Sequence, residues 1–543
     1  MKFDFKKRSA VVGIIVLIFV STSAYKTDYF EIAKQIDIFT TLFKKVNMNY
    51  VDETNPADLM QESVKQMLKE LDPYTTYMNE QDIERARINQ SGAYVGIGAT
   101  LNTSKNKLVV LEVYKDLPAD KAGLKAGDEI IKIDGLEVKD LEESATQFLS
   151  GKKNTTATLV YLRNGTATEV SVSRADVKPK AVPIYKLLST GIGYIALDRF
   201  SKTASKEVEN ALKLLLIDEA KGVILDLRNN PGGLLQEAVK IVNLFVPKGQ
   251  LVVSTQSNIE AYNQAFETQK QPLSLEIPLV VLINQNSASA SEIVAGALQD
   301  LDRAVIIGKR SFGKGLVQRP MPLPYGSQLK ITISRYYTPS GRCIQALDYR
   351  NRSENGAAVR YDENQYAAFK TKNGRTVYDG GGINPDVIVG AEKPNPFIEK
   401  LLKSPLIFDY SNQYYHNNTV DNLERFQLDK KEFERFKTMS LKEKYSTIGG
   451  IQDEINQLKN TLSEQGLGIE QTGFKDLEIA LRASKLKLMD TFESEISAVL
   501  EEELIKRYFY REGMYTYFLD TSKEVIKAQE VITDLNTYNN ILK

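Results

Sequence analysis

The stretch that decides the fold is KGVILDLRNNPGGLLQEAVKIVNLF, residues 221 to 245. It opens with a short apolar run over 221–228 that is typical of a buried strand. Asn, Pro and two glycines then mark a turn, and an apolar pattern of helical period follows over 234–245. The stretch therefore predicts a strand, a tight turn and a helix in direct succession.

The same alternation extends in both directions, from about residue 184 to residue 390. Strands alternating with helices are typical of a layered α/β domain with a largely parallel sheet. The further expected elements are strands GIGYIALDRF (191–200), PLVVLINQ (278–285) and RAVIIG (303–308), and helices SKEVENALKLLLIDEA (205–220) and SASASEIVAGALQD (287–300).

At 543 residues the chain is too long for one compact domain. Its composition and hydrophobic pattern change at several points, from helical to Gly-rich and β-rich, then to α/β, and finally to charged and helical. We therefore expect a leader over 1–24, an N-terminal helical region over 25–92, a β-rich domain over 93–174, an α/β core over 175–394 and a C-terminal helical region over 395–543.

The composition excludes several classes of function. The formal net charge is zero, so bulk electrostatics gives no indication of a nucleic-acid partner. A single Cys, Cys343, excludes an intrachain disulfide, and with a single His, His416, a Cys/His zinc site is excluded by counting. We expect neither a metal nor an organic cofactor.

The N-terminus has the form of a secretory signal. Basic residues precede an apolar run from Ala10 to Val20, and small residues follow it up to Ala24. The run of 11 residues is shorter than the ~20 needed to span a bilayer. Cleavage near Ala24 and a retained anchor are both consistent with this pattern, and both place the mature chain outside the cytoplasm, in the periplasm or on the inner membrane facing it.

The segment AGLKAGDEIIKIDG (122–135) places glycines as turns around a strand, and YVGIGATL (94–101) precedes it. This combination resembles a PDZ domain. PDZ domains bind a peptide as an added strand and hold its terminal carboxylate with backbone N–H groups of a Gly-rich loop. The resemblance places that loop at Val95, Gly96, Ile97 and Gly98. The alternative is a small β domain that only separates its neighbours.

Two segments of the α/β region carry candidate reactive groups. In NSASASEIVAGALQD (286–300), Ser289 and Glu292 fit the capping box S-x-x-E at a helix start, and Ser287 could also cap. One of Ser287, Ser289 and Ser291 is alternatively a candidate nucleophile. In SFGKGLVQ (311–318), Lys314 lies between two glycines and Gln318 follows four residues later. The spacing is not that of a phosphate loop. The free N–H groups of the DLRNNPGG turn could receive an oxyanion.

Together these segments resemble the tail-specific, or C-terminal-processing, serine peptidases. The family's elements occur in order and at its spacing over about residues 35–390, with LDPYT carrying Tyr74 where a noncatalytic His is common. The remaining matching segments are GYIALDRF (193–200), YYTPSGRCIQ (336–345) and GGINPDV (381–387).

The resemblance implies a fold, a mechanism and site residues. The fold is a multidomain α/β protein with a crotonase/ClpP-like layered protease core, an inserted PDZ domain and helical N- and C-terminal regions. The mechanism is a Ser/Lys dyad. In this sequence the nucleophile is Ser289, the base is Lys314, Gln318 orients the Lys, and the oxyanion hole is formed by the N–H of Ala290 and one of Gly232 or Gly233.

The residue types suit this chemistry. A Ser hydroxyl is a poor nucleophile until a neighbour takes its proton. Lysine can do so only when neutral, and its ordinary pKa is about 10.4. Burial lowers the pKa of a lysine because desolvation disfavours the charged form. The single His416 lies in a polar Tyr/Asn-rich segment outside the α/β region, which argues against a Ser-His-Asp triad.

The sequence thus predicts an exported endopeptidase whose substrates are proteins or peptides with free C-termini. The alternative is a catalytically inactive PDZ-type binding scaffold, which would be expected to lack Ser289 or Lys314. The amphipathic tail over 395–543 is either a helical appendage that packs on the protease or a surface that binds an adaptor or a second copy of the chain. The terminal helices could form the contact between copies. No nucleic-acid partner is expected.

Overall fold

The structure is a computed structural model that describes residues 29–104, 107–353, 356–390, 395–423, 426–445, 450–467 and 471–543. The leader expected over 1–24 lies outside the described residues. Within the described part of the chain, no helix combines the length and the apolar character needed to cross a membrane. The chain divides into two compact units, of which the first comprises the residues up to 78 together with 320–331, and the second the remainder.

The first unit contains the expected N-terminal helices. One helix covers 29–49, and α2 covers Pro56–Lys69, with Asn55 capping its first turn. The break LDPYTTYM contains a short strand, β1 (Thr76–Met78), which pairs antiparallel with residues 328–330 of the chain. The helical period gave no sign of this strand, because three residues are too few to show an alternation.

The second unit starts with α3 (Glu80–Ser91) and the β-rich domain. A central antiparallel sheet has the order β3-β4-β5-β7-β8, with β6 paired to β5. Leu108, Ile130 and Leu159 fill its core. The short helix expected at ESATQFLSG is a 3₁₀ helix, η2 (Glu142–Leu149). The strands are β2 (Tyr94–Gly96), β3 (Ala99–Ser104), β4 (Lys107–Val113), β5 (Glu129–Ile133), β6 (Leu136–Glu137), β7 (Thr156–Arg163), β8 (Thr166–Ser173) and β9 (Ala175–Val177), and a short helix is α4 (Pro118–Lys121).

The α/β core contains a six-stranded sheet of order β10-β11-β12-β15-β16-β23, in which every pair except β10·β11 is parallel. This confirms the largely parallel sheet expected from the alternation. The strands are β10 (Tyr185–Leu187), β11 (Gly193–Ala196), β12 (Val223–Asp226), β15 (Leu279–Ile283), β16 (Val305–Gly308) and β23 (Val387–Ile388).

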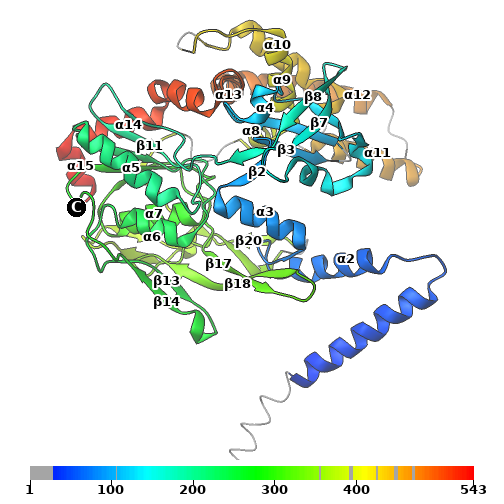
Figure 1. The fold of residues 1–543 in the computed structure, drawn as a ribbon, viewed down its shortest axis with the longest axis horizontal. Helices are drawn as coiled ribbons and strands as arrows, with labels where there is room; N and C mark the ends of the chain where they lie inside the picture. The colour runs from blue at the N-terminus through cyan, green and yellow to red at the C-terminus, as the bar shows by residue number, and fades with distance from the viewer. Residues whose placement is uncertain are drawn as a thin grey trace, which may run out of the picture. The chain divides into compact units, whose positions relative to one another are not determined.

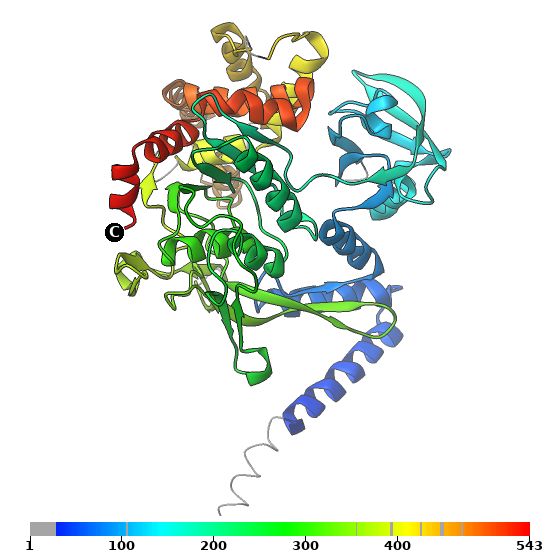
Figure 2. The same ribbon diagram turned by 60° about the vertical axis from the view of Figure 1, so that its left-hand side comes forward.

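Each face of this sheet is covered by helices from a different part of the chain. On one face, Val281 and its neighbours pack against α5 (Ala204–Ile217), α6 (Leu235–Val242) and α7 (Ala290–Asp300). On the other, Val280 and Leu282 pack against α14 (Lys523–Thr533) and α15 (Leu535–Ile541) (Figures 1 and 2). Because both faces are covered, the central strands β11, β15 and β16 contain no charged residue, and β12 is apolar up to its last residue, Asp226.

A second, antiparallel sheet flanks the core. In it β13 (Leu251–Gln256) pairs with β14 (Gln264–Glu267) and with residues 335–337 of β18 (Gln328–Tyr337). Strand β17 (Leu316–Pro322) pairs with β18. Residues beyond 394 are mainly helical, as expected, and α13 breaks at Tyr510, where φ is 58°. The helices are α8 (Pro396–Leu402), α9 (Pro405–Asn417), α10 (Lys430–Ser440), α11 (Ile451–Glu464), α12 (Gln471–Thr491) and α13 (Glu493–Thr521).

Candidate active site

The candidate site lies at the carboxyl ends of two neighbouring parallel strands. Strand β12 leads into the DLRNNPGG turn and β15 leads into the serine-rich stretch, so the register of the sheet brings the two loops together. The Ala288 N–H donates to the Asn230 carbonyl at 3.0 Å, and the Ser287 hydroxyl donates to the Leu227 carbonyl at 2.7 Å. These bonds fix the start of α7 against the turn.

The three serines of the stretch differ in what their hydroxyls do. Ser287 and Ser291 are both fully buried, and the Ser291 hydroxyl donates to the Asn230 carbonyl at 2.9 Å. Ser289 is only partly buried. The structure therefore gives Ser287 and Ser291 a role in packing and leaves Ser289 as the serine of the three with solvent access.

Ser289 has a strained backbone at the N-cap position of α7. Its φ is 56° and its ψ is −112°, an uncommon conformation for a residue other than glycine. Such conformations cost about 1–3 kcal/mol and cluster at functional sites. Ser289 occupies the N-cap position of α7, next to the first turn, where the helix dipole favours negative charge. The capping interpretation and the nucleophile interpretation are compatible.

Glu292 connects the serine stretch to the lysine loop. Its side chain is fully buried, and one carboxylate oxygen, Oε2, accepts the Ser289 N–H at 2.7 Å and the Lys314 N–H at 2.9 Å. The other oxygen accepts the Ser311 hydroxyl and the Gly313 N–H, each at 2.6 Å. Ser289 and Lys314, 25 positions apart in sequence, therefore share one acceptor atom.

Burial is the largest effect on this carboxyl and raises the pKa of Glu292, whereas the hydrogen bonds lower it. The sequence identified Glu292 only as part of a capping box. Its contacts with the lysine loop could not be read from the chain, because they depend on where a distant loop is folded.

Lys314 lies in a loop whose two glycines permit close packing. Gly313 has a φ of 89°, and a methyl group there would lie 2.3 Å from the Ala346 side chain. The Gly315 N–H donates to the Gln345 side chain at 2.8 Å. Lys314 itself is half-buried, and the hydrogen bond from its N–H to Glu292 fixes the backbone from which its side chain extends.

Gln318 lies on β17, and its amide nitrogen is 3.2 Å from the Thr332 hydroxyl of β18. Its expected role in orienting Lys314 stays a prediction. On the other side of Ser289, the Tyr336 hydroxyl of β18 donates to the Ser289 carbonyl at 3.3 Å. The antiparallel sheet thus contributes to the site next to the α/β sheet, which the motifs did not show.

The two candidate oxyanion glycines of the PGG turn differ in what their N–H groups bind. The Gly232 N–H donates to the Asn230 side chain at 2.9 Å, whereas among the described residues the Gly233 N–H meets no acceptor. A methyl group at Gly232 would lie 2.9 Å from the Ala290 nitrogen. Glycine at 232 therefore keeps open the space in front of the Ala290 N–H, and Gly233 is the better candidate for the second donor.

Replacing Glu292 by Gln is expected to lower kcat by about 10- to 100-fold, because a small displacement of the reacting groups lowers the rate by factors of this size. The amide NH₂ has to replace one carboxylate oxygen, and each of those oxygens faces N–H or O–H donors. Steady-state kinetics on a peptide substrate checks this. Glu237→Gln, at a buried carboxyl of α6 that accepts the Ser205 N–H, is the matched control and should keep kcat within about twofold.

The same variant should change the pH dependence of stability. The pKa of Glu292 is raised above its ordinary value of 4.5, so its contribution favours the folded state below pH 4.5 and is lost as the pH rises through the raised pKa. Glu292→Gln removes this effect. Urea unfolding at several pH values should show that the stability difference between the two proteins shifts toward wild type at low pH, and an unchanged difference would contradict this.

The Gly-rich loop of the β domain has the arrangement expected of a peptide site. Val95 and Gly96 lie in β2, and Gly98, with a φ of 79°, turns the chain into β3. Strand β3 is at the end of its sheet's order, so one of its edges is unpaired within the sheet. Ile97 is buried in the domain core. An added peptide strand could therefore continue the sheet next to this loop.

His416 belongs to the C-terminal helices and not to the α/β core. It is in the last turn of α9, and burial chiefly lowers its pKa. The charged groups that act on it are Asp128, Arg163, Lys125 and Arg507. None of these residues belongs to the serine stretch or the lysine loop.

Comparison with known families agrees with this arrangement. Residues 191–350 match the model of peptidase family S41, residues 95–173 match a PDZ domain, and residues 397–532 match the probable PDZ-protease C-terminal helical domain. The fold and its domains therefore define a PDZ-containing serine-type peptidase.

Curated relatives place the chain more narrowly. It is 38% identical over 322 residues to a carboxy-terminal-processing protease of Bartonella bacilliformis, covering 58% of this chain and 73% of that protein. It is 33% identical over 343 residues to a probable CtpA-like serine protease of Staphylococcus aureus, covering 62% and 68% of the two chains. The chain belongs to the carboxy-terminal-processing proteases of family S41.

Solved structures of similar proteins include the photosystem II D1 C-terminal processing protease. It has a TM-score of 0.36 and 26% sequence identity, and the match covers 60% of this chain and 91% of that one.

Proposed function

We propose that the protein is an exported serine endopeptidase that cleaves peptide bonds through an acyl-enzyme formed by Ser289 and Lys314. The observation that carries this proposal is the shared Glu292 oxygen, which holds the Ser289 and Lys314 backbones next to each other. The partial exposure of Ser289 supports it. A catalytically inactive binding scaffold would be expected to lack Ser289 or Lys314, and this chain has both.

The reaction follows from the groups present. Neutral Lys314 takes the proton of the Ser289 hydroxyl as its oxygen attacks the scissile carbonyl. The carbonyl oxygen becomes an oxyanion, which the N–H groups of Ala290 and Gly233 stabilise. The protonated Lys314 then gives its proton to the leaving amine. Water, deprotonated by the same Lys314, hydrolyses the acyl-enzyme and restores Ser289. Gln318 is proposed to orient Lys314.

Substrate selection is proposed to rest on the PDZ domain. The loop Val95–Gly98 would hold a terminal carboxylate with its N–H groups, and the peptide would add to the open edge of β3. The substrates are then proteins or peptides with free C-termini. The basic and apolar N-terminus supports export to the periplasm, either free after cleavage near Ala24 or anchored to the inner membrane.

One experiment tests both parts. An unfolded protein with an apolar C-terminus, as the free carboxylate or the amide, is incubated with the protein before and after treatment with a fluorophosphonate. We expect the free carboxylate to be cut faster, the reagent to block cutting, and peptide mapping to place the phosphonyl group on Ser289. Equal cutting of both substrates removes tail recognition, and labelling elsewhere or no cutting rejects the Ser289 mechanism.

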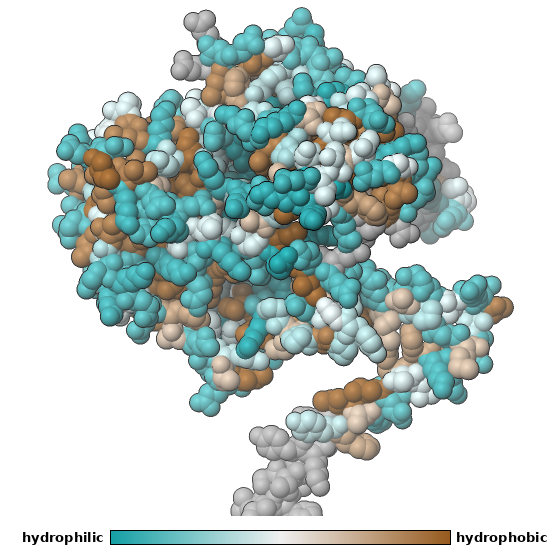
Figure 3. All heavy atoms as spheres, in the orientation of Figure 1, coloured by the Kyte–Doolittle hydropathy of each residue, from teal (hydrophilic) through white to brown (hydrophobic). Residues whose placement is uncertain are grey.

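The N-terminal helix is proposed to join two copies of the chain. In the helix over 29–49 and the residue after it, apolar side chains recur at alternating spacings of three and four, which is a heptad pattern. Figure 3 shows apolar side chains along this helix. The stripe consists of Tyr29, Ile32, Ile36, Phe39, Phe43, Val46 and Tyr50. An adaptor on the C-terminal helices is a further proposed partner.

Ile36→Asp is expected to convert a dimer into a monomer, because it places a charge in the stripe. Ile38→Asp is the matched control: Ile36 and Ile38 are 61% and 49% exposed, and Ile38 lies outside the stripe. Sedimentation equilibrium of the full chain measures the mass. A monomeric wild type, or a dimer that survives Ile36→Asp, would contradict the proposed contact.

A further inference from the structure

Helix α13 makes a two-sided contact at Arg511, immediately after its break at Tyr510. The Arg511 guanidinium binds both carboxylate oxygens of Glu112, on strand β4 of the PDZ domain, at 2.6 and 2.7 Å. Its remaining nitrogen donates to Asp198, two residues after the end of core strand β11, at 2.7 Å. One planar cation therefore joins the PDZ domain to the peptidase core.

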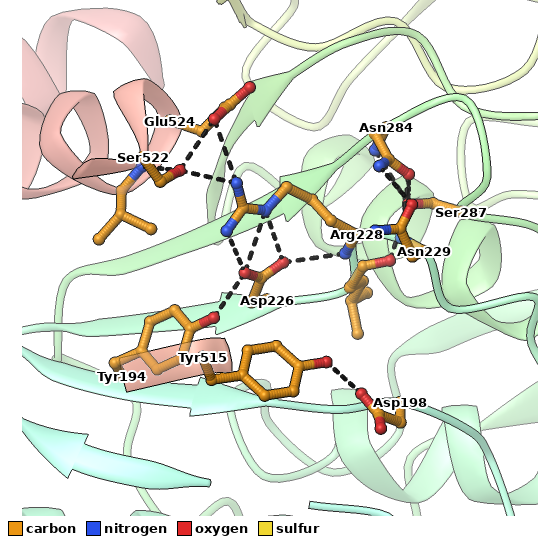
Figure 4. Close-up of polar contacts among 12 residues, drawn as sticks. Tyr194, Asp198, Asp226, Arg228, Asn229, Asn284, Ser287, Tyr515, Ser522 and Glu524 are labelled. Atoms are coloured by element: carbon orange, nitrogen blue, oxygen red, sulfur yellow. Dashed lines mark hydrogen bonds and ion pairs between the residues drawn. The ribbon is translucent and has the colours of Figure 1, made fainter. Parts of the chain in front are cut away.

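Asp198 is held from the same helix by a second group. The Tyr515 hydroxyl donates to its other carboxylate oxygen (Figure 4). Arg511 and Tyr515 are four residues apart and therefore lie on one face of the helix. The side chains of Glu112 and Asp198 are only 13% and 12% exposed. Water therefore has little access to these carboxylates and cannot fully replace the hydrogen bonds that Arg511 donates to them.

The segment that contains Asp198 supports the PGG turn. The Leu197 carbonyl accepts the Asn230 side chain at 2.6 Å, and the Phe200 N–H donates to the Gly232 carbonyl at 3.0 Å. The Phe200 carbonyl in turn accepts the Leu234 N–H at 2.9 Å. The proposed oxyanion turn is thus hydrogen-bonded to the backbone of Leu197 and Phe200, on either side of Asp198.

A second contact from the C-terminal helices reaches the start of the same turn. Arg228 is bound by Asp226 and also donates to Ser522 at 2.7 Å and to Glu524 at 3.1 Å (Figure 4). The Tyr194 hydroxyl completes this network with a bond to Asp226 at 2.6 Å. Both strand ends that carry the turn are therefore held by residues 511–524.

We propose that Arg511 is a positioning residue of the peptidase, which acts through Asp198 to fix the backbone that supports the oxyanion turn. The inference rests on the proposed function. It assigns to the C-terminal helical domain a part in the reaction, because the cation that holds Asp198 comes from α13. It also links the turn to the PDZ domain, because the same guanidinium holds Glu112.

The test compares variants that all act on α13 in the full chain. Arg511→Gln is expected to lower kcat, and the rate at which a fluorophosphonate labels Ser289, by about 10- to 100-fold, with KM for an amidated peptide within about twofold. Arg511→Lys should recover part of the loss. Tyr510→Phe is the control, because its hydroxyl contacts Asp120 of the PDZ domain at 2.6 Å and its change leaves the contacts of Arg511 and Tyr515 with Asp198 in place.

Asp198→Asn is the second variant, and it keeps the volume of the side chain while removing its charge. It should reproduce the loss of kcat and of labelling if Arg511→Gln does not fold. Wild-type rates in Arg511→Gln or in Asp198→Asn, or an equal loss in Tyr510→Phe, would overturn the inference. If the wild-type protein is not labelled at Ser289, the proposed function fails instead, so the two failures are distinguishable.

Discussion

Ser289→Ala is expected to lower kcat by about 10⁵-fold or more, because removing the nucleophile of a serine peptidase leaves only binding and oxyanion stabilisation. The fold and peptide binding by the PDZ domain should not change. Cleavage of an unfolded protein, followed by mass spectrometry, measures the loss, and circular dichroism reports the fold. Ser291→Ala is the matched control, since its hydroxyl bonds to Asn230 and has no part in the proposed chemistry.

The role of the base can be separated from its charge. Arginine at position 314 keeps a cation in the loop but cannot give up a proton. Lys314→Arg should therefore lose as much activity as Lys314→Ala. Activity that survives Ser289→Ala, or that Arg restores at 314, would contradict the dyad.

Gly232→Ala is expected to reduce kcat by about 10²- to 10³-fold, the effect of losing one oxyanion donor. The new methyl group would lie 2.9 Å from the Ala290 nitrogen and 2.6 Å from the Ala288 carbonyl oxygen, so it occupies the space proposed for the oxyanion. KM should change less, because the ground-state carbonyl depends less on this space than the transition state does. Steady-state kinetics on a peptide checks the ratio.

A second glycine separates this effect from backbone strain. Gly135 has a φ of 84°, close to the 96° of Gly232, but a methyl group there meets nothing within 4 Å. Gly135→Ala should carry the same strain of a positive φ without the close contacts, and should leave kcat within about twofold. If both variants lose kcat equally, or if Gly232→Ala remains active, the turn does not form the oxyanion site.

The α/β core was predictable because its central strands are almost entirely apolar and its helices have a clear period. The dyad of Ser289 and Lys314 stays a prediction that rests on the family resemblance, since no local pattern connects residues 25 positions apart. In the structure, hydrogen bonds from both backbones to Glu292 bring these two residues together. The sequence indicated Glu292 only as part of a helix-capping box.

Other features depend on distant partners and could not be read from the chain. The amphipathic period of residues 523–541 showed that one side of these helices is apolar, but not that the sheet of the protease core covers it. The strand β1 was too short to recognise, and its partner lies some 250 residues further along the chain. The choice between Gly232 and Gly233 needed the Asn230 side chain, whose direction no motif gives.

The position of α14 and α15 sets an order for the maturation of the protein. A chain is made from its N-terminus, so the core strands and α5 to α7 emerge long before residues 523–541 can cover the second face of the sheet. Burying Val525, Val531 and Ile532 contributes about 1.5–3 kcal/mol each, a large part of the 5–15 kcal/mol that stabilises a typical domain. A chain made only as far as residue 522 therefore carries every proposed catalytic residue, but the second face of its core sheet is still uncovered.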